Sequence, residues 1–189
     1  EARQYYHYVL KEYQSREIYN NIGVLTIMEA MGYFKEGEFI YQLPLELDLE
    51  SSVSERLGTA ELELRKKLLE EALRNFDAAI SLDPNYAPAY LNKACAYTLL
   101  GDAPRAQFYA EIEAIQCATK NNRPETASDA RVLLGILAAI RGDNATAQKI
   151  LEAEAAFKNP LAETNLKILL GTTITTNPKP EKDETIDGI

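Results

Sequence analysis

Small and aromatic residues recur at helical spacing near the middle of the chain and predict an amphipathic helix over residues 72–82. Ala72, Phe76 and Ala79 share one face of this helix. Pro84 follows and ends it, because proline cannot donate the next backbone hydrogen bond. One large residue between two small ones is a pattern typical of a helix that packs closely on another.

A second amphipathic helix follows directly. Tyr90, Ala94 and Tyr97 recur at helical spacing and share its apolar face. Gly101-Asp102 marks its end, since glycine is the residue that most often closes a helix. The two helices and the turn between them therefore predict a helix–turn–helix unit.

The unit repeats, because Ala106 opens a further helix 34 residues after Ala72. A helix–turn–helix period of 34 residues with this pattern of large and small residues resembles the tetratricopeptide repeat family. The resemblance implies an all-α fold of helix pairs stacked in a right-handed superhelix. It also implies an interaction scaffold, without naming the partner.

The pattern recurs more weakly downstream. Residues 131–138 mirror residues 90–97, and Ala147 stands 41 residues after Ala106. The seven residues beyond the ideal period would fit about two extra helical turns or a longer loop through residues 119–124. Pro124 and the paired asparagines favour the loop, with a modest helix extension before it.

The pattern also recurs upstream, where Tyr19 and Gly23 take the places of Tyr90 and Ala94. Residues 1–13 are rich in tyrosine and are expected to form the second helix of a repeat whose first helix lies outside this sequence. We therefore expect the chain to be a fragment of a larger protein.

Between the upstream and central units the helical pattern fails. Residues 38–50 alternate apolar and polar side chains, which is typical of extended chain, and Pro44 argues against a central strand. We expect a non-helical insertion over about residues 35–55, followed by one long helix from Glu55 to Leu82. A degenerate repeat beginning near Ser54 is the alternative.

These patterns divide the chain into two parts. Residues 1–170 are expected to form one helical repeat domain, closed by a capping helix over about residues 161–170, because a terminal repeat otherwise leaves an apolar face in water. Residues 171–189 are rich in Thr, Pro, Lys, Asp and Glu and are expected to be an extended tail or linker.

Composition narrows the classes of partner. The net charge of −9 and the absence of a stripe of Lys and Arg argue against nucleic acid, because phosphate binding requires clustered cations. No apolar run reaches the length of about 20 residues that a membrane span needs, so direct membrane insertion is not expected. Protein or peptide partners remain.

No residue pattern predicts catalysis, a metal site or a cofactor. The single histidine, His7, lies among tyrosines in a helical stretch, where a packing or surface role is expected. Paired carboxylates such as Glu70 and Glu71 fall on the polar side of a helix, where solubility and ion pairing explain them. We therefore expect a protein that is not an enzyme.

The resemblance also implies a binding surface, since the first helix of each tetratricopeptide repeat lines a concave face. Asparagine amides on that face suit a peptide main chain, and apolar side chains suit a partner's side chains. The candidate groove residues are Asn20, Asn21, Val24, Asn92, Cys95, Leu99, Val132 and Ile136.

Two accounts of this groove stay open. A separate peptide or protein segment binds in it, or the insertion near residues 39–49 or the tail near Ile174 fills it. The function expected is thus a peptide-binding scaffold. The alternatives are an accessory domain of an enzyme whose catalytic part lies elsewhere, and a structural spacer with a self-filled groove.

Overall fold

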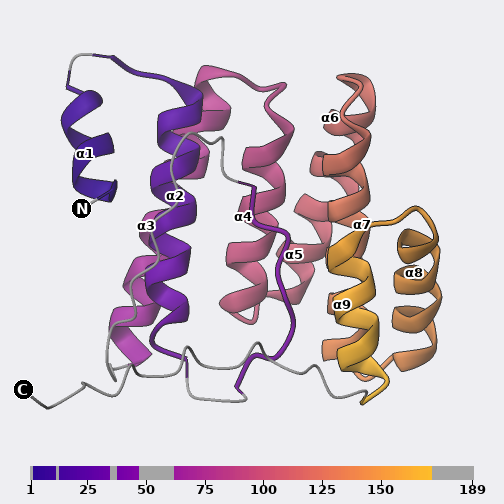
Figure 1. Ribbon diagram of the computed structural model, residues 1–189. Helices are drawn as coiled ribbons and strands as arrows, with labels where there is room; N and C mark the ends of the chain where they lie inside the picture. Colours follow the sequence, from indigo (N-terminus) through magenta and orange to yellow (C-terminus); the bar gives the residue numbers. More distant parts are fainter. Residues whose placement is uncertain (1, 12, 35–37, 47–61, 172–189) are drawn as a thin grey trace, which may run out of the picture.

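The computed structural model describes residues 2–11, 13–34, 38–46 and 62–171, and every regular element among them is a helix (Figure 1). The predicted all-α fold is confirmed. The elements are α1 (Ala2–Val9), α2 (Arg16–Met31), α3 (Leu62–Leu82), α4 (Ala87–Leu99), α5 (Ala103–Phe108), the π-helical segment η1 (Tyr109–Ala114), α6 (Ile115–Lys120), α7 (Pro124–Ile140), α8 (Asn144–Ala156) and α9 (Pro160–Leu169).

The helices pack as antiparallel pairs that stand side by side (Figure 1). In each pair a first helix packs on a second: α2 on α3, α4 on the continuous run α5–η1–α6, and α7 on α8. Helix α1 lies against α2 at one end of the row, and α9 packs on α8 and α7 at the other. The right-handed superhelix implied by the resemblance stays a prediction.

The same local signal starts the second helix of the central and last pairs. Gly101 and Gly142 adopt positive φ angles of 76° and 82°, which glycine tolerates because it has no Cβ. Asp102 and Asp143 then cap the following helices, and their carboxylates accept hydrogen bonds from Arg105 N–H and Thr146 N–H. Both turns therefore follow from a Gly-Asp dipeptide.

The seven residues beyond the ideal period do not lengthen the loop, so that prediction is wrong. Helix α6 continues to Lys120, and α7 already begins at Pro124, which leaves only residues 121–123 between them. Pro124 occupies the first turn of α7, where a missing N–H costs nothing. The extra residues lie in the helices: the run from Ala106 to Lys120 extends four residues further than that from Ala72 to Leu82, and α7 has 17 residues compared with 13 in α4, so each gains about one turn.

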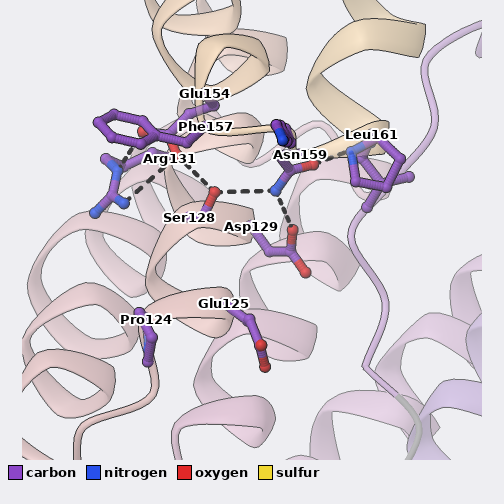
Figure 2. A pocket seen from close by; sticks show the side chains of 11 residues that line it. Pro124, Glu125, Ser128, Asp129, Arg131, Glu154, Phe157, Asn159 and Leu161 are labelled. Carbon is purple, nitrogen blue, oxygen red and sulfur yellow. Dashed lines mark hydrogen bonds and ion pairs between the residues drawn. The ribbon is translucent and has the colours of Figure 1, made fainter.

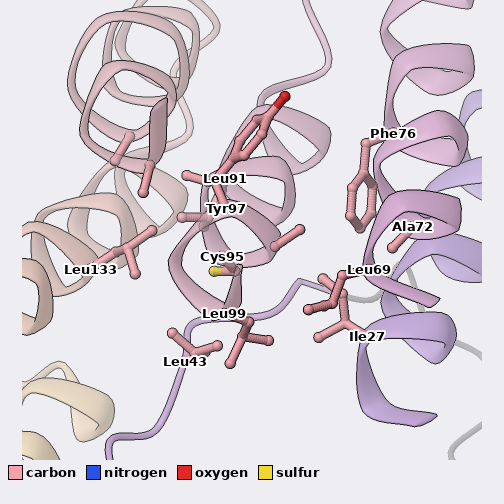
Figure 3. Close-up of a cluster of buried hydrophobic side chains, with 14 of the residues drawn as sticks. Ile27, Leu43, Leu69, Ala72, Phe76, Leu91, Cys95, Tyr97, Leu99 and Leu133 are labelled. Carbon is pink, nitrogen blue, oxygen red and sulfur yellow. The ribbon is translucent and has the colours of Figure 1, made fainter. Parts of the chain in front are cut away.

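The largest hydrophobic cluster joins the first and second helices of the upstream and central pairs. Phe76 and Leu69 of α3 meet Ile27 of α2 and Leu91 of α4 in its interior (Figure 3). Tyr97 stacks on Tyr109 at a centroid separation of 5.5 Å, which fixes α4 against η1. The core is thus continuous across the two pairs.

Several expectations fall partly outside the described residues. Helix α3 begins at Leu62, and the earlier part of the long helix expected from Glu55 lies outside them. The same holds for residues 35–37 and 47–55 of the expected insertion and for residues 172–189 of the expected tail. The described part of the insertion, residues 38–46, has no helix.

Candidate peptide-binding groove

Residues 38–46 lie across the first helices of the pairs, and we call them the resident segment. In Figure 1 they form the purple trace that passes beside α4. Hydrogen bonds join the segment to α2, α4, α7 and α9. Its numbering rises as that of α4 falls, since Pro44 meets Cys95 and Glu46 meets Asn92, so the two run antiparallel.

Asn92 of α4 pairs with the main chain of Glu46 through both of its amide atoms. Its Nδ2 donates to the Glu46 carbonyl oxygen at 2.7 Å, and the Glu46 N–H donates to Asn92 Oδ1 at 2.8 Å. Asn20 of α2 donates to the same carbonyl at 2.9 Å. The Asn92 amide also donates to Asn20 Oδ1 at 2.9 Å. Both asparagines are fully buried, so these bonds satisfy groups that would be costly to leave unpaired.

Asn165 of α9 repeats this pairing four residues earlier in the segment. The Gln42 N–H donates to Asn165 Oδ1 at 2.8 Å, and Asn165 Nδ2 donates to the Gln42 carbonyl at 2.9 Å. Asn165 is fully buried. Side-chain amides at two places thus bind both main-chain groups of a residue, as a neighbouring strand would.

Residues 38–46 are non-helical, with a tight turn at Pro44 in which the Leu45 N–H donates to the Leu43 carbonyl at 3.0 Å, and their main-chain contacts with the helices recur at every second residue. In extended chain, alternate residues present their main-chain groups to the same side. Gln42, Pro44 and Glu46 follow that period, and the Pro44 carbonyl faces the Cys95 thiol, with Sγ at 3.8 Å. Proline at position 44 has no N–H, and here only its carbonyl is engaged.

The apolar side chains of the resident segment join the hydrophobic clusters. Leu43 is only 8% exposed and lies near Cys95 and Leu99 (Figure 3). Phe39 and Leu45 pack against the same cluster. Covering apolar area of this kind stabilises the docked segment by about 1.5 to 3 kcal/mol for each fully buried side chain.

The eight groove residues expected from the sequence have different places. Asn20, Asn92 and Cys95 contact the resident segment, whereas Asn21 donates to the Tyr6 hydroxyl of α1 at 3.4 Å. The apolar members are buried in hydrophobic clusters and do not form an open floor: Val24, Leu99, Val132 and Ile136.

Sequence reasoning missed Asn165, which lies in the helix expected only as a cap. One signal could have found it. Asparagine is disfavoured inside a helix, so one between apolar neighbours such as Leu161 and Leu166 indicates a hydrogen-bonding role. The carboxyl of Glu46 and the hydroxyl of Thr126, which form a hydrogen bond of 3.2 Å, gave no such signal.

The Glu46 carboxyl sits in an unfavourable place for a negative charge. Burial raises its pKa from the ordinary 4.5 to about 7, and the charges of Asp129 and Glu125 add to this. The Thr126 hydrogen bond and the Arg123 charge act in the opposite direction but do not offset the rise. The pKa of Asp129 is also raised, by burial first and then by Glu125 and Glu154, against a hydrogen bond from Asn159.

Asp129 and Glu125 line a pocket of about 670 Å³ between α7 and the α8–α9 turn (Figure 2). Asn159 in this turn donates to Asp129 Oδ1 at 2.7 Å and to Ser128 Oγ at 3.0 Å. Glu154, only 4% exposed, accepts from Arg131 Nε at 2.5 Å, so these two charges compensate each other. Asp129 has no cation bound to it among the described residues.

Two kinds of feature are absent from the described part of the chain. No group of three or more His, Cys, Asp or Glu side chains there has an arrangement that could hold a metal ion. None of the helices in that part is both long and apolar enough to cross a membrane.

Part of the chain is similar to a known family. Residues 75–108 match the family model described as "Tetratricopeptide repeat", which spans the end of α3, all of α4 and α5. No curated protein and no solved structure matches the chain. The match supports the tetratricopeptide family, whose members are generally non-catalytic interaction scaffolds that bind proteins or peptides.

Proposed function

We propose that this protein is an interaction module whose first-helix face binds an extended polypeptide segment through its main chain. The observation that carries the proposal is the pairing of Asn92 with both main-chain groups of Glu46, repeated by Asn165 on Gln42. Main-chain pairing requires no particular side chain at those positions. The same amides could therefore bind a partner's segment in place of the resident one.

In this account the resident segment occupies the groove until a partner competes for it. A partner binds only the fraction of molecules whose groove is open, so its apparent affinity is lowered by that fraction. Leu43→Ala removes a buried side chain from the resident segment and should open the groove more often. Binding of a separate peptide to the groove should therefore be easiest to measure with this variant.

The test uses a fluorescently labelled peptide with the sequence of residues 38–46, added to the Leu43→Ala chain. Fluorescence anisotropy should report saturable binding, tighter than to the wild-type chain. Asn92→Ala and Asn165→Ala in the receptor should each weaken binding by about 1 to 3 kcal/mol, because they leave buried main-chain groups unpaired. Asn75→Ala on α3 is the matched control, since Asn75 donates to Glu71 within its own helix, and it should leave the affinity unchanged.

A structural spacer with a self-filled groove is the second candidate, and it is favoured by the same resident segment. It differs in one outcome. A spacer never exchanges its segment, so neither chain would bind the peptide, even at high concentration. Binding that survives both asparagine substitutions would also contradict the proposed function.

A further inference from the structure

Position 46 of the resident segment faces more negative than positive charge. The Glu46 carboxyl accepts a hydrogen bond from Thr126 of α7 at 3.2 Å, next to Glu125 and one turn before Asp129. Burial is the main cause that raises its pKa, Asp129 and Glu125 add to it, and Arg123, just before α7, acts against them. On the sides of α4 and α2, the segment meets the uncharged amides of Asn92 and Asn20. The resident segment thus places a carboxylate beside two others.

The cations near this place do not neutralise the two carboxylates. Arg131 is bound to Glu154, and Lys158, which also lines the pocket, is not among the charges that act on Asp129. Arg123 acts on Glu46 but forms no ion pair with it among the described residues. A cation supplied from outside would therefore find an uncompensated charge at Asp129.

The two carboxylates that act on position 46 also line the pocket between α7 and the α8–α9 turn. Asp129 and Glu125 line it together with Phe157, which is 80% exposed (Figure 2). A Lys or Arg head group can pair with a carboxylate and also lie over an aromatic ring. A basic side chain at position 46 would therefore meet Asp129 and Glu125, and aromatic surface lies in the same pocket.

We propose that the groove selects an extended partner segment with a basic residue at the place of Glu46, and that this partner displaces residues 38–46. The inference rests on the proposed function and adds the chemical class of the partner. The partner shares two features with the resident segment: apolar side chains at alternate positions, as at Tyr41 and Leu43, and a main chain open to Asn92. It differs in charge at the place of Glu46, where Asp129 and Glu125 repel a carboxylate and attract a basic group.

The test compares three labelled peptides with the sequence of residues 38–46, which end in Glu, Gln or Lys at the place of Glu46. Each is titrated into the Leu43→Ala chain at pH 7.5. The Lys peptide should bind roughly tenfold or more tightly than the Glu peptide, with the Gln peptide between them, because opposite charge replaces like charge at a partly buried site. Lowering the pH to 5.5 should bring the Glu peptide close to the Gln peptide.

Receptor variants locate the effect. Asp129→Asn removes the charge but keeps the shape and the hydrogen bond from Asn159, so it should shrink the Lys preference several-fold. Glu152→Gln is the matched control, since Glu152 is exposed on α8 and bonds within its own helix, and it should leave the preference intact. Equal affinities of the Lys and Gln peptides, or a preference unchanged by Asp129→Asn, would overturn the proposal.

A measurement on the chain's own resident segment separates this inference from the proposed function. If none of the peptides binds, the function fails, but Glu46→Lys and Glu46→Gln in the chain itself still test the charge rule. Amide exchange at Gln42 should be slower in Glu46→Lys than in Glu46→Gln, because the basic residue holds the segment in the groove. Equal exchange in the two variants would overturn the charge rule on its own.

Discussion

Gly23 of α2 lies directly against the ring of Phe76 of α3, and a Cβ at position 23 would be 2.4 Å from Phe76 Cε1. The last pair has a similar relationship, since a Cβ at Gly135 would lie 3.0 Å from Leu151 Cγ. Both large side chains are fully buried. The absence of a side chain on the first helix thus lets the second helix approach closely. This close approach is the physical reason why large and small residues alternate in the repeat.

Gly23→Ala should therefore destabilise the fold. The added methyl group overpacks a buried contact, at a cost of about 1 to 3 kcal/mol. Alanine is the better helix former by about 1 kcal/mol, which offsets part of that cost. Chemical denaturation followed by circular dichroism measures the net change.

The compensating change is a smaller residue at position 76. Phe76→Leu in the Gly23→Ala background should cost less than Phe76→Leu alone, because it relieves the overlap. If the two substitutions add independently, the contact between Gly23 and Phe76 does not limit the packing.

Ala106→Leu should also destabilise the protein, since Ala106 is fully buried in the core that α4 shares with α5. We expect a loss of about 1 to 3 kcal/mol of unfolding free energy from overpacking. The same substitution at Ala153, which is exposed on α8, is the control and should change stability little. A thermal melt of Ala106→Leu that matches the wild type would contradict the packing account.

Stability should depend on pH through Glu46. Its pKa is raised to about 7 in the folded state from an ordinary 4.5, so the folded state favours the protonated carboxyl. The stability that this carboxyl contributes is present below about pH 4.5 and is lost as the pH rises to about 7. The loss is up to about 3 kcal/mol, the free energy that corresponds to the difference in pKa.

Glu46→Gln isolates this contribution, because glutamine resembles the protonated carboxyl at every pH. The variant should match the wild type near pH 4.5 and exceed it in unfolding free energy at pH 8. Comparing the two proteins at each pH removes the contributions of the other carboxyl groups. A difference that stays constant from pH 4.5 to pH 8 would refute the role of Glu46.

Much of the fold could be predicted from local patterns. The spacing of Ala72 and Ala106 gave the repeat, and Gly101-Asp102 gave a turn whose geometry the structure explains. The crossing before α7 was mispredicted because Pro124 signals a loop and the start of a helix equally well. The choice between a longer loop and longer helices depends on how these helices pack, which the local sequence does not show.

The groove could be predicted only in part, for a different reason. Asn20 and Asn92 were found because the repeat places them on the first helices, but nothing local relates Asn165 to Gln42, 123 residues earlier. The raised pKa of Glu46 likewise depends on its burial and then on Asp129 and Glu125, which are far away in the sequence. Contacts between distant segments are set by the tertiary structure and cannot be predicted from the spacing of residues along the sequence.

Amide hydrogen exchange by NMR tests the central claim most directly, because it reports whether the main chain of residues 38–46 is bound in the groove. The account predicts slow exchange at Gln42 and Glu46, and fast exchange at Tyr41, whose N–H has no acceptor among the described residues. Asn92→Ala should release the Glu46 amide while Gln42, bound by Asn165, stays protected. Exchange at Gln42 and Glu46 as fast as in the free peptide of residues 38–46 would contradict the account.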